Sequence, residues 1–193
     1  MMALLEAAAA PGYPAEIALV LANRADAAGL TQAAARGVPT ALVESRGRDR
    51  AAFEAEVCDV LDAQRIDIVA LAGFMRVLTP GFVRAWEGRM INIHPSLLPA
   101  FPGLDTHARA LAASVDRHGC TVHLVTAGVD EGPVLAQTSV PILPGDTAAT
   151  LAERVLAAEH ILYPEALARF AANPLPPIPL QRAPTLSTHA NPD

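Results

Sequence analysis

The sequence predicts an α/β domain in which helices flank a mostly parallel central sheet. Short continuous apolar runs, typical of strands buried on both faces, alternate along the chain with segments whose apolar residues recur at helical spacing. Glycine, proline or a polar loop closes these segments. The length of 193 residues is enough for one compact domain and short of two.

The first half of the chain contains three predicted helices and three predicted strands. Pro11 ends the first helix, and Gly37 closes the second. The third helix begins at Arg50 and has apolar residues at helical spacing from Phe53 to Leu61. In chain order we expect a helix over 2–10, a strand over 17–21, a helix over 26–36, a strand over 40–43, the helix from Arg50 and a strand over 67–72.

The second half continues the alternation and ends in a long helix. Pro95 cuts off one strand, and the final helix carries an apolar stripe from Leu151 to Leu162. Pro164 is expected to kink that helix or to begin its last segment. We expect a strand over 89–94, a helix over 105–115, strands over 121–125 and 134–142, and the final helix over 147–170.

Composition and charge exclude several classes of protein. The net charge of −6 argues against a nucleic-acid surface or an anionic membrane surface. The two cysteines lack CxxC spacing and are too few for a disulfide scaffold. No apolar run approaches the roughly 20 residues of a membrane span, and the start lacks the basic segment of a secretory signal. We therefore expect a soluble, cytoplasmic protein that acts on small molecules, without nucleic acid or membrane.

Prolines divide the chain into two parts. Six prolines lie after Asn173, a density that favours an extended arm over a second domain. We therefore expect one domain over residues 1–173, followed by a proline-rich arm over 174–193.

The segment Met90–Pro99 carries the most informative chemistry. In a strand, Asn92 and His94 project from the same face, and they stand at the carboxyl end of a buried run. Open α/β sheets bind their ligands just beyond those ends. A polar pair that ties down the following loop is the simpler alternative for either residue alone.

A second candidate is the loop Gly128–Pro133, which by itself has ordinary turn composition. A carboxylate from Asp130 placed near His94 would orient that imidazole and favour its charged form. Together Asn92, His94 and Asp130 would supply a donor, a titratable group and a tuning carboxylate, without a covalent nucleophile.

Other reactive residue types are weaker candidates. His118, Cys120 and His123 resemble metal ligands, but alternation in a strand places His123 on the opposite face, so we expect no metal. Ser96 lacks the flanking glycines of a nucleophile elbow.

Four motifs in this order resemble a known family. The segments Leu71–Leu78, Asn92–Pro99, Pro102–His107 and Val129–Pro133 are similar to those of the phosphoribosylglycinamide formyltransferases, also called glycinamide ribonucleotide transformylases. The similarity covers about residues 2–171. The resemblance implies a Rossmann-like fold and transfer of a formyl group from the co-substrate 10-formyltetrahydrofolate to glycinamide ribonucleotide in purine synthesis, by direct attack through a tetrahedral intermediate. It implies no metal, and a homodimer is conceivable.

The resemblance also implies roles for individual residues. It assigns catalysis to Asn92, His94 and Asp130, and Glu159 becomes the most specific polar contact of the ribonucleotide. It assigns formylfolate contacts to Arg50, Met75, Arg76, Val77, Leu78, Asn92, Thr126, Ala127, Gly128, Val129 and Asp130, and ribonucleotide contacts to Leu156, Ala157, Ala158 and Glu159.

One departure from the family concerns the start of the chain. Members open with a buried strand and a Gly-Ser turn that holds the substrate phosphate with backbone N–H groups. Met2–Ala7 matches the helix that follows this turn, so we expect the first strand and the phosphate loop to lie upstream of the chain. Two rival functions stay open: a formyltetrahydrofolate hydrolase, in which water replaces the amine, and a folate-binding module of low activity, which the missing phosphate loop favours.

Overall fold

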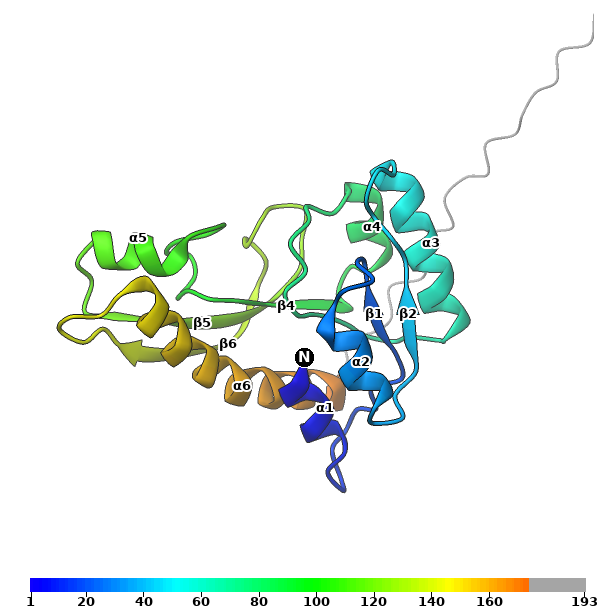
Figure 1. Ribbon diagram of the computed structural model, residues 1–193, viewed down its shortest axis with the longest axis horizontal. Coiled ribbons are helices and arrows are strands. Elements are labelled where there is room, and N and C mark those ends of the chain that lie inside the picture. Colours follow the sequence, from blue (N-terminus) through cyan, green and yellow to red (C-terminus); the bar gives the residue numbers. More distant parts are fainter. Residues whose placement is uncertain (174–193) are drawn as a thin grey trace, which may run out of the picture.

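The computed structural model describes residues 1–173, whose strands form two sheets flanked by helices (Figure 1). This architecture confirms the predicted α/β class. The proline-rich arm expected over 174–193 lies outside the described residues. No helix within residues 1–173 combines the length and the hydropathy needed to cross a membrane.

The smaller sheet contains two parallel strands, β1 (Val20–Ala22) and β2 (Thr40–Leu42). Helix α1 (Met2–Ala8) precedes β1, and helix α2 (Ala28–Ala34) connects the two strands. Each element is a few residues shorter than the apolar pattern predicts. The strand order along the chain and the parallel pairing agree with the expected strand–helix alternation.

The larger sheet has the order β3–β4–β5–β6. Strands β3 (Val69–Leu71) and β4 (Met90–His94) are parallel, and they are linked by helix α4 (Pro80–Ala85). Strands β5 (Arg117–Leu124) and β6 (Val134–Pro141) extend the sheet by antiparallel pairing. Helix α5 (Thr106–Ala112) lies between β4 and β5 in the chain.

The sequence pattern missed two features of this region. Helix α4 has only six residues, which is too short for apolar periodicity to reveal it, and it is started by the Thr79 side chain, which accepts from the Phe82 N–H. Strand β5 begins four residues before the predicted position, because backbone pairing with β6 extends to Arg117.

Helix α6 (Ala148–Ala172) runs without interruption through Pro164, so this proline does not begin a separate segment. The helix starts with a capping box formed by Thr147 and Thr150. It packs along β5 and β6 (Figure 1). In the second half of the helix the buried Tyr163 hydroxyl donates to the carbonyl of Leu71 at 2.8 Å, which ties the helix to β3.

Two apolar clusters form the core. One lies between α6 and the larger sheet, where Ile91 and Val122 meet Leu151 and Val155. The other surrounds the fully buried Trp86 and includes residues of helix α3 (Arg50–Ala63). Since β4 contributes to both clusters, it is buried on its two faces, as its apolar sequence predicts.

Candidate active site

The candidate site begins at the carboxyl end of β4. The side chain of His94 is buried and that of Asn92 is half-buried. Pairing with β5 sets His123 opposite Asn92 and Thr121 opposite His94. The chain then turns away at Pro95, so polar groups meet at the edge of an apolar core.

Asp130 reaches this edge from the loop between β5 and β6. One of its carboxylate oxygens, Oδ2, lies 3.3 Å from Nδ1 of His94, and both side chains are about 90% buried. The same oxygen accepts a hydrogen bond from the Gly103 N–H at 2.8 Å. Two loops far apart in the sequence are therefore joined through one carboxylate, beside the histidine.

The backbone of both loops is shaped for this contact. Asp130 has a φ of +57°, a left-handed conformation that short acidic side chains tolerate better than most. A Cβ atom at Gly132 would lie 1.7 Å from the carbonyl oxygen of Leu124, so only glycine fits there. The loop is thus held tightly against the end of β5, where it presents Asp130.

Both ring nitrogens of His94 face oxygen atoms. Nδ1 faces the Asp130 carboxylate, and Nε2 lies 3.0 Å from the carbonyl oxygen of Phe101. The ring can donate to both only when both nitrogens carry a proton. The site therefore accommodates an imidazolium, whose Nε2–H is available to another acceptor when the Phe101 carbonyl is displaced.

His123 joins the cluster in the opposite role. Its Nδ1 donates to the carbonyl of Leu124 at 2.8 Å, so Nε2 is free to accept from the side-chain amide of Asn92 at 3.3 Å. Burial lowers the pKa of His123, although Asp130 Oδ1 lies 3.6 Å from Nε2 and acts in the opposite direction. A neutral His123 orients the Asn92 amide and leaves its second N–H free to donate.

Sequence reasoning missed His123 because it considered only the strand that carries it. Alternation along β5 predicts that His118 and His123 lie on opposite faces, but it does not say which residues of β4 lie beside them. The register between β4 and β5 decides that His123 lies beside Asn92. No signal in a single sequence specifies that register. Within residues 1–173, no group of three or more His, Cys, Asp or Glu side chains is arranged to hold a metal ion.

The expected formylfolate contacts fall into two groups. The loop over Thr126–Asp130 is joined to the site through Asp130, and Asn92 lies within it. Met75 and Val77 are exposed, whereas Arg76 stacks on the Phe53 ring at 5.3 Å and donates to the Ser45 carbonyl at 3.3 Å. No hydrogen bond or ion pair within the described chain joins the second group, Arg50 and the segment 75–78, to the histidine cluster.

The expected ribonucleotide contacts lie on the middle of α6. Leu156 and Ala157 are exposed, while Ala158 and Glu159 are half-buried. Burial raises the pKa of the Glu159 carboxyl, and the nearby amino group of Met1 partly offsets this effect. Glu159 is thus a partly desolvated acid near the start of α1, separate in the chain from the cluster around His94.

Comparison with known proteins adds three relationships. A family described as formyl transferase matches residues 1–167. The chain is 41% identical over 172 residues to phosphoribosylglycinamide formyltransferase from Escherichia coli (strain K12), covering 89% of this chain and 81% of that protein. The crystal structure of phosphoribosylglycinamide formyltransferase from Brucella melitensis superposes with a TM-score of 0.84 and 52% identity, covering 91% of each chain.

A longer relative shares only one part with this chain. The trifunctional purine biosynthetic protein adenosine-3 from Drosophila pseudoobscura pseudoobscura is 46% identical over 178 residues. The match covers 91% of this chain and 13% of that protein. The chain therefore spans about an eighth of the length of this relative.

Proposed function

The chain belongs to the formyl transferase family, and from this premise we propose that it transfers the formyl group of 10-formyltetrahydrofolate to the amine of glycinamide ribonucleotide. This reaction is a step of de novo purine biosynthesis. The observation that carries the proposal is the meeting of Asn92, His94 and Asp130 at the end of β4. The matches to phosphoribosylglycinamide formyltransferases over most of their length support this substrate pair.

In the proposed mechanism the substrate amine attacks the formyl carbon, and negative charge develops on the formyl oxygen. His94 donates its Nε2–H to that oxygen in place of the Phe101 carbonyl, which it faces at 3.0 Å. Asn92 donates the amide N–H that His123 does not use. Asp130 keeps the imidazolium oriented through Nδ1.

The transfer balances without a covalent enzyme intermediate. A new carbon–nitrogen bond forms to the amine, and the bond between the formyl carbon and the folate nitrogen breaks. The attacking amine loses one proton, and the departing folate nitrogen gains one through water. Alignment of the two bound substrates supplies much of the remaining acceleration.

Activity of the His94→Ala variant tests the proposal. Purified protein is given 10-formyltetrahydrofolate with and without glycinamide ribonucleotide, and formylated ribonucleotide, tetrahydrofolate and formate are measured. We expect His94→Ala to lower kcat by about 10²- to 10⁴-fold. The exposed Gln32→Ala on α2 serves as the matched control and should leave the rate unchanged.

The same assay separates the rival functions. Formate released without ribonucleotide would assign the site to a hydrolase, in which water replaces the amine. Saturable folate binding without either product would assign it to a binding module. Near wild-type turnover by His94→Ala would remove this histidine from the mechanism.

The cellular location and the oligomeric state of the enzyme are also part of the proposed function. We place it in the cytoplasm, supported by the two cysteines without close spacing and the net charge of −6. We also propose that the protein forms a homodimer. Light scattering tests this, because a dimer would have twice the molar mass of the 193-residue chain.

A further inference from the structure

The segment between β3 and α4, residues 73–79, leaves the larger sheet beside the candidate site. Leu71 pairs with Asn92 in the parallel ladder of β3 and β4, so the chain that follows Leu71 emerges at the same carboxyl edge as the site. Two apolar side chains of this segment are exposed to solvent, Met75 to 82% and Val77 to 59%. Apolar groups beside a few polar site residues are suited to contact the flat ring system of a folate.

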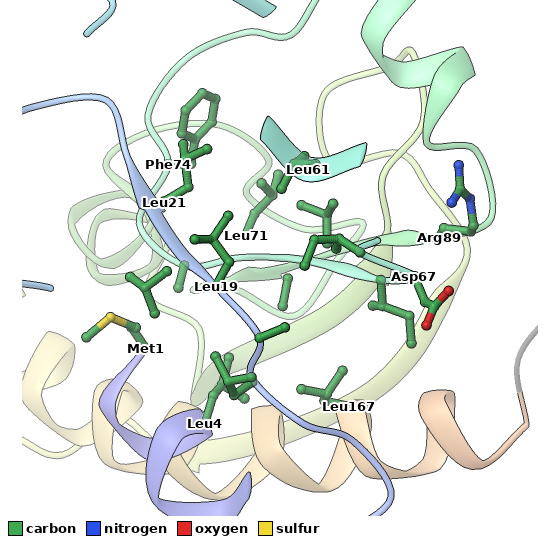
Figure 2. A pocket seen from close by; sticks show the side chains of 18 of the residues that line it. Met1, Leu4, Leu19, Leu21, Leu61, Asp67, Leu71, Phe74, Arg89 and Leu167 are labelled. Atoms are coloured by element: carbon green, nitrogen blue, oxygen red, sulfur yellow. The ribbon is translucent and has the colours of Figure 1, made fainter. Parts of the chain in front are cut away.

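The intervening side chains of the segment face inward. Phe74 and Leu78 pack against the apolar cluster around Trp86. Phe74 also lines, together with Leu61 and Leu71, a cavity of about 990 Å³ that is bordered by residues of both sheets (Figure 2). The inward side chains therefore decide how the exposed pair is presented.

Helix α3 holds the segment through two consecutive side chains. The guanidinium of Arg76 lies over the Phe53 ring, 5.3 Å from its centroid, and donates to the Ser45 carbonyl at 3.3 Å. The Glu54 carboxylate accepts from the N–H of Thr79 at 2.9 Å and also from the Thr79 hydroxyl. Arg76 is thus held in the middle of the segment, and Thr79 is held at its end.

A buried carboxylate needs a reason at this place. Only 4% of Glu54 is exposed, and burial of a carboxylate is costly unless a cation or hydrogen bonds compensate it. Within residues 1–173 no Lys, Arg or His side chain forms an ion pair with Glu54, and both of its carboxylate oxygens bond to Thr79. An apolar side chain would pack here without that cost, so the carboxylate has a specific use at Thr79.

We propose that Glu54 is a positioning residue for the co-substrate: by holding Thr79 it keeps residues 75–78 in the conformation that presents Met75 and Val77 to the folate. The inference rests on the proposed function, which takes 10-formyltetrahydrofolate as co-substrate. A segment released at Thr79 visits other conformations, and the apparent affinity falls with the fraction of molecules that keep the binding conformation. The transfer step uses groups on β4 and on the loop between β5 and β6, so kcat should change little once folate is bound.

Substitutions of Glu54 separate this role from a purely stabilising one. Glu54→Met keeps most of the side-chain volume and removes both hydrogen bonds to Thr79. Glu54→Gln retains them, since the amide oxygen accepts from the Thr79 N–H and the amide nitrogen donates to the Thr79 hydroxyl oxygen. Val140→Ala, in the apolar cluster between α6 and the larger sheet, is the matched control because it lowers stability away from the segment.

Binding and turnover are measured separately. Calorimetric titration with tetrahydrofolate gives Kd, and initial rates at saturating glycinamide ribonucleotide give kcat and KM for 10-formyltetrahydrofolate. We expect Glu54→Met to raise Kd and KM at least about tenfold and to leave kcat within about twofold of the wild type. Glu54→Gln should keep Kd and KM within about threefold of the wild type, and Val140→Ala should leave both unchanged.

Thr79 offers a second pair of variants should Glu54→Met not fold. Thr79→Val removes the hydroxyl that donates to Glu54, and Thr79→Ser keeps it, so Kd should rise at least about threefold in the first and not in the second. If the wild type binds tetrahydrofolate and Glu54→Met has the same Kd, or if kcat falls at unchanged KM, the positioning role is overturned and the proposed function stands. A wild type that binds no tetrahydrofolate would overturn both.

Discussion

Replacing Asp130 with asparagine removes the charge beside His94 and keeps the shape of the side chain. The carboxylate Oδ2 accepts from the Gly103 N–H at 2.8 Å and faces His94 Nδ1 at 3.3 Å. An amide oxygen in the same place still accepts from both. The loop between β5 and β6 therefore stays attached, and only the electrostatic support of the imidazolium is lost.

The size of the effect follows from that loss. A hydrogen bond to a charged group contributes about 1.5–3 kcal/mol and a neutral one about 0.5–1.5 kcal/mol, so the change weakens this contact by about 1–2 kcal/mol. The catalytic cost is larger, because the charge of Asp130 no longer supports a ring that donates through Nδ1 and, to the developing oxyanion, through Nε2. We expect kcat to fall by about 10²- to 10⁴-fold, equivalent to about 3–5 kcal/mol of activation free energy.

Initial rates with both substrates measure this effect, and thermal unfolding followed by circular dichroism checks the fold. The Tm should match that of the wild type. The double variant Asp130→Asn with His94→Ala should be no slower than His94→Ala alone, because the carboxylate acts through the ring. A loss below tenfold at unchanged Tm, or losses that multiply in the double variant, would refute this reasoning.

Three further predictions concern neighbouring residues. His123→Phe leaves the Asn92 amide without its acceptor and should lower kcat by about tenfold with KM for folate unchanged; an equal rise in KM would point to a binding role. Gly132→Ala should cost at least about 1–3 kcal/mol in urea unfolding, because its Cβ would meet a backbone oxygen at 1.7 Å; unchanged stability would contradict that contact. Burial, aided by the charge of His107, lowers the pKa of His118 to about 4. The unfolded chain therefore takes up this proton first, so stability is full above about pH 6.5 and falls by up to about 1.4 kcal/mol per pH unit from there to about pH 4. Urea titrations at pH 7.5, 6 and 5 measure this slope, which should be shallower in His118→Phe; equal slopes would exclude this histidine as the cause.

Local sequence was sufficient for most elements. The sequence predicted a strand near each of the six strands found within residues 1–173, and the apolar runs at β1 and β3 are typical of strands buried on both faces. Local sequence was insufficient to predict α4, because contacts outside this helix position its six residues. One such contact is the buried carboxylate of Glu54, which accepts from the Thr79 N–H at 2.9 Å.

The sequence by itself determined the fold class, the polar pair Asn92 and His94 at a strand end, and the motifs of the family. Alternation along one strand settles which of its residues share a face, and that information is local. Only the tertiary structure decided that Asp130 meets His94 and that His123 holds the Asn92 amide. These contacts depend on strand register and on loops brought together across the sheet, and the free energy that selects them is spread over the whole core rather than held in any local segment.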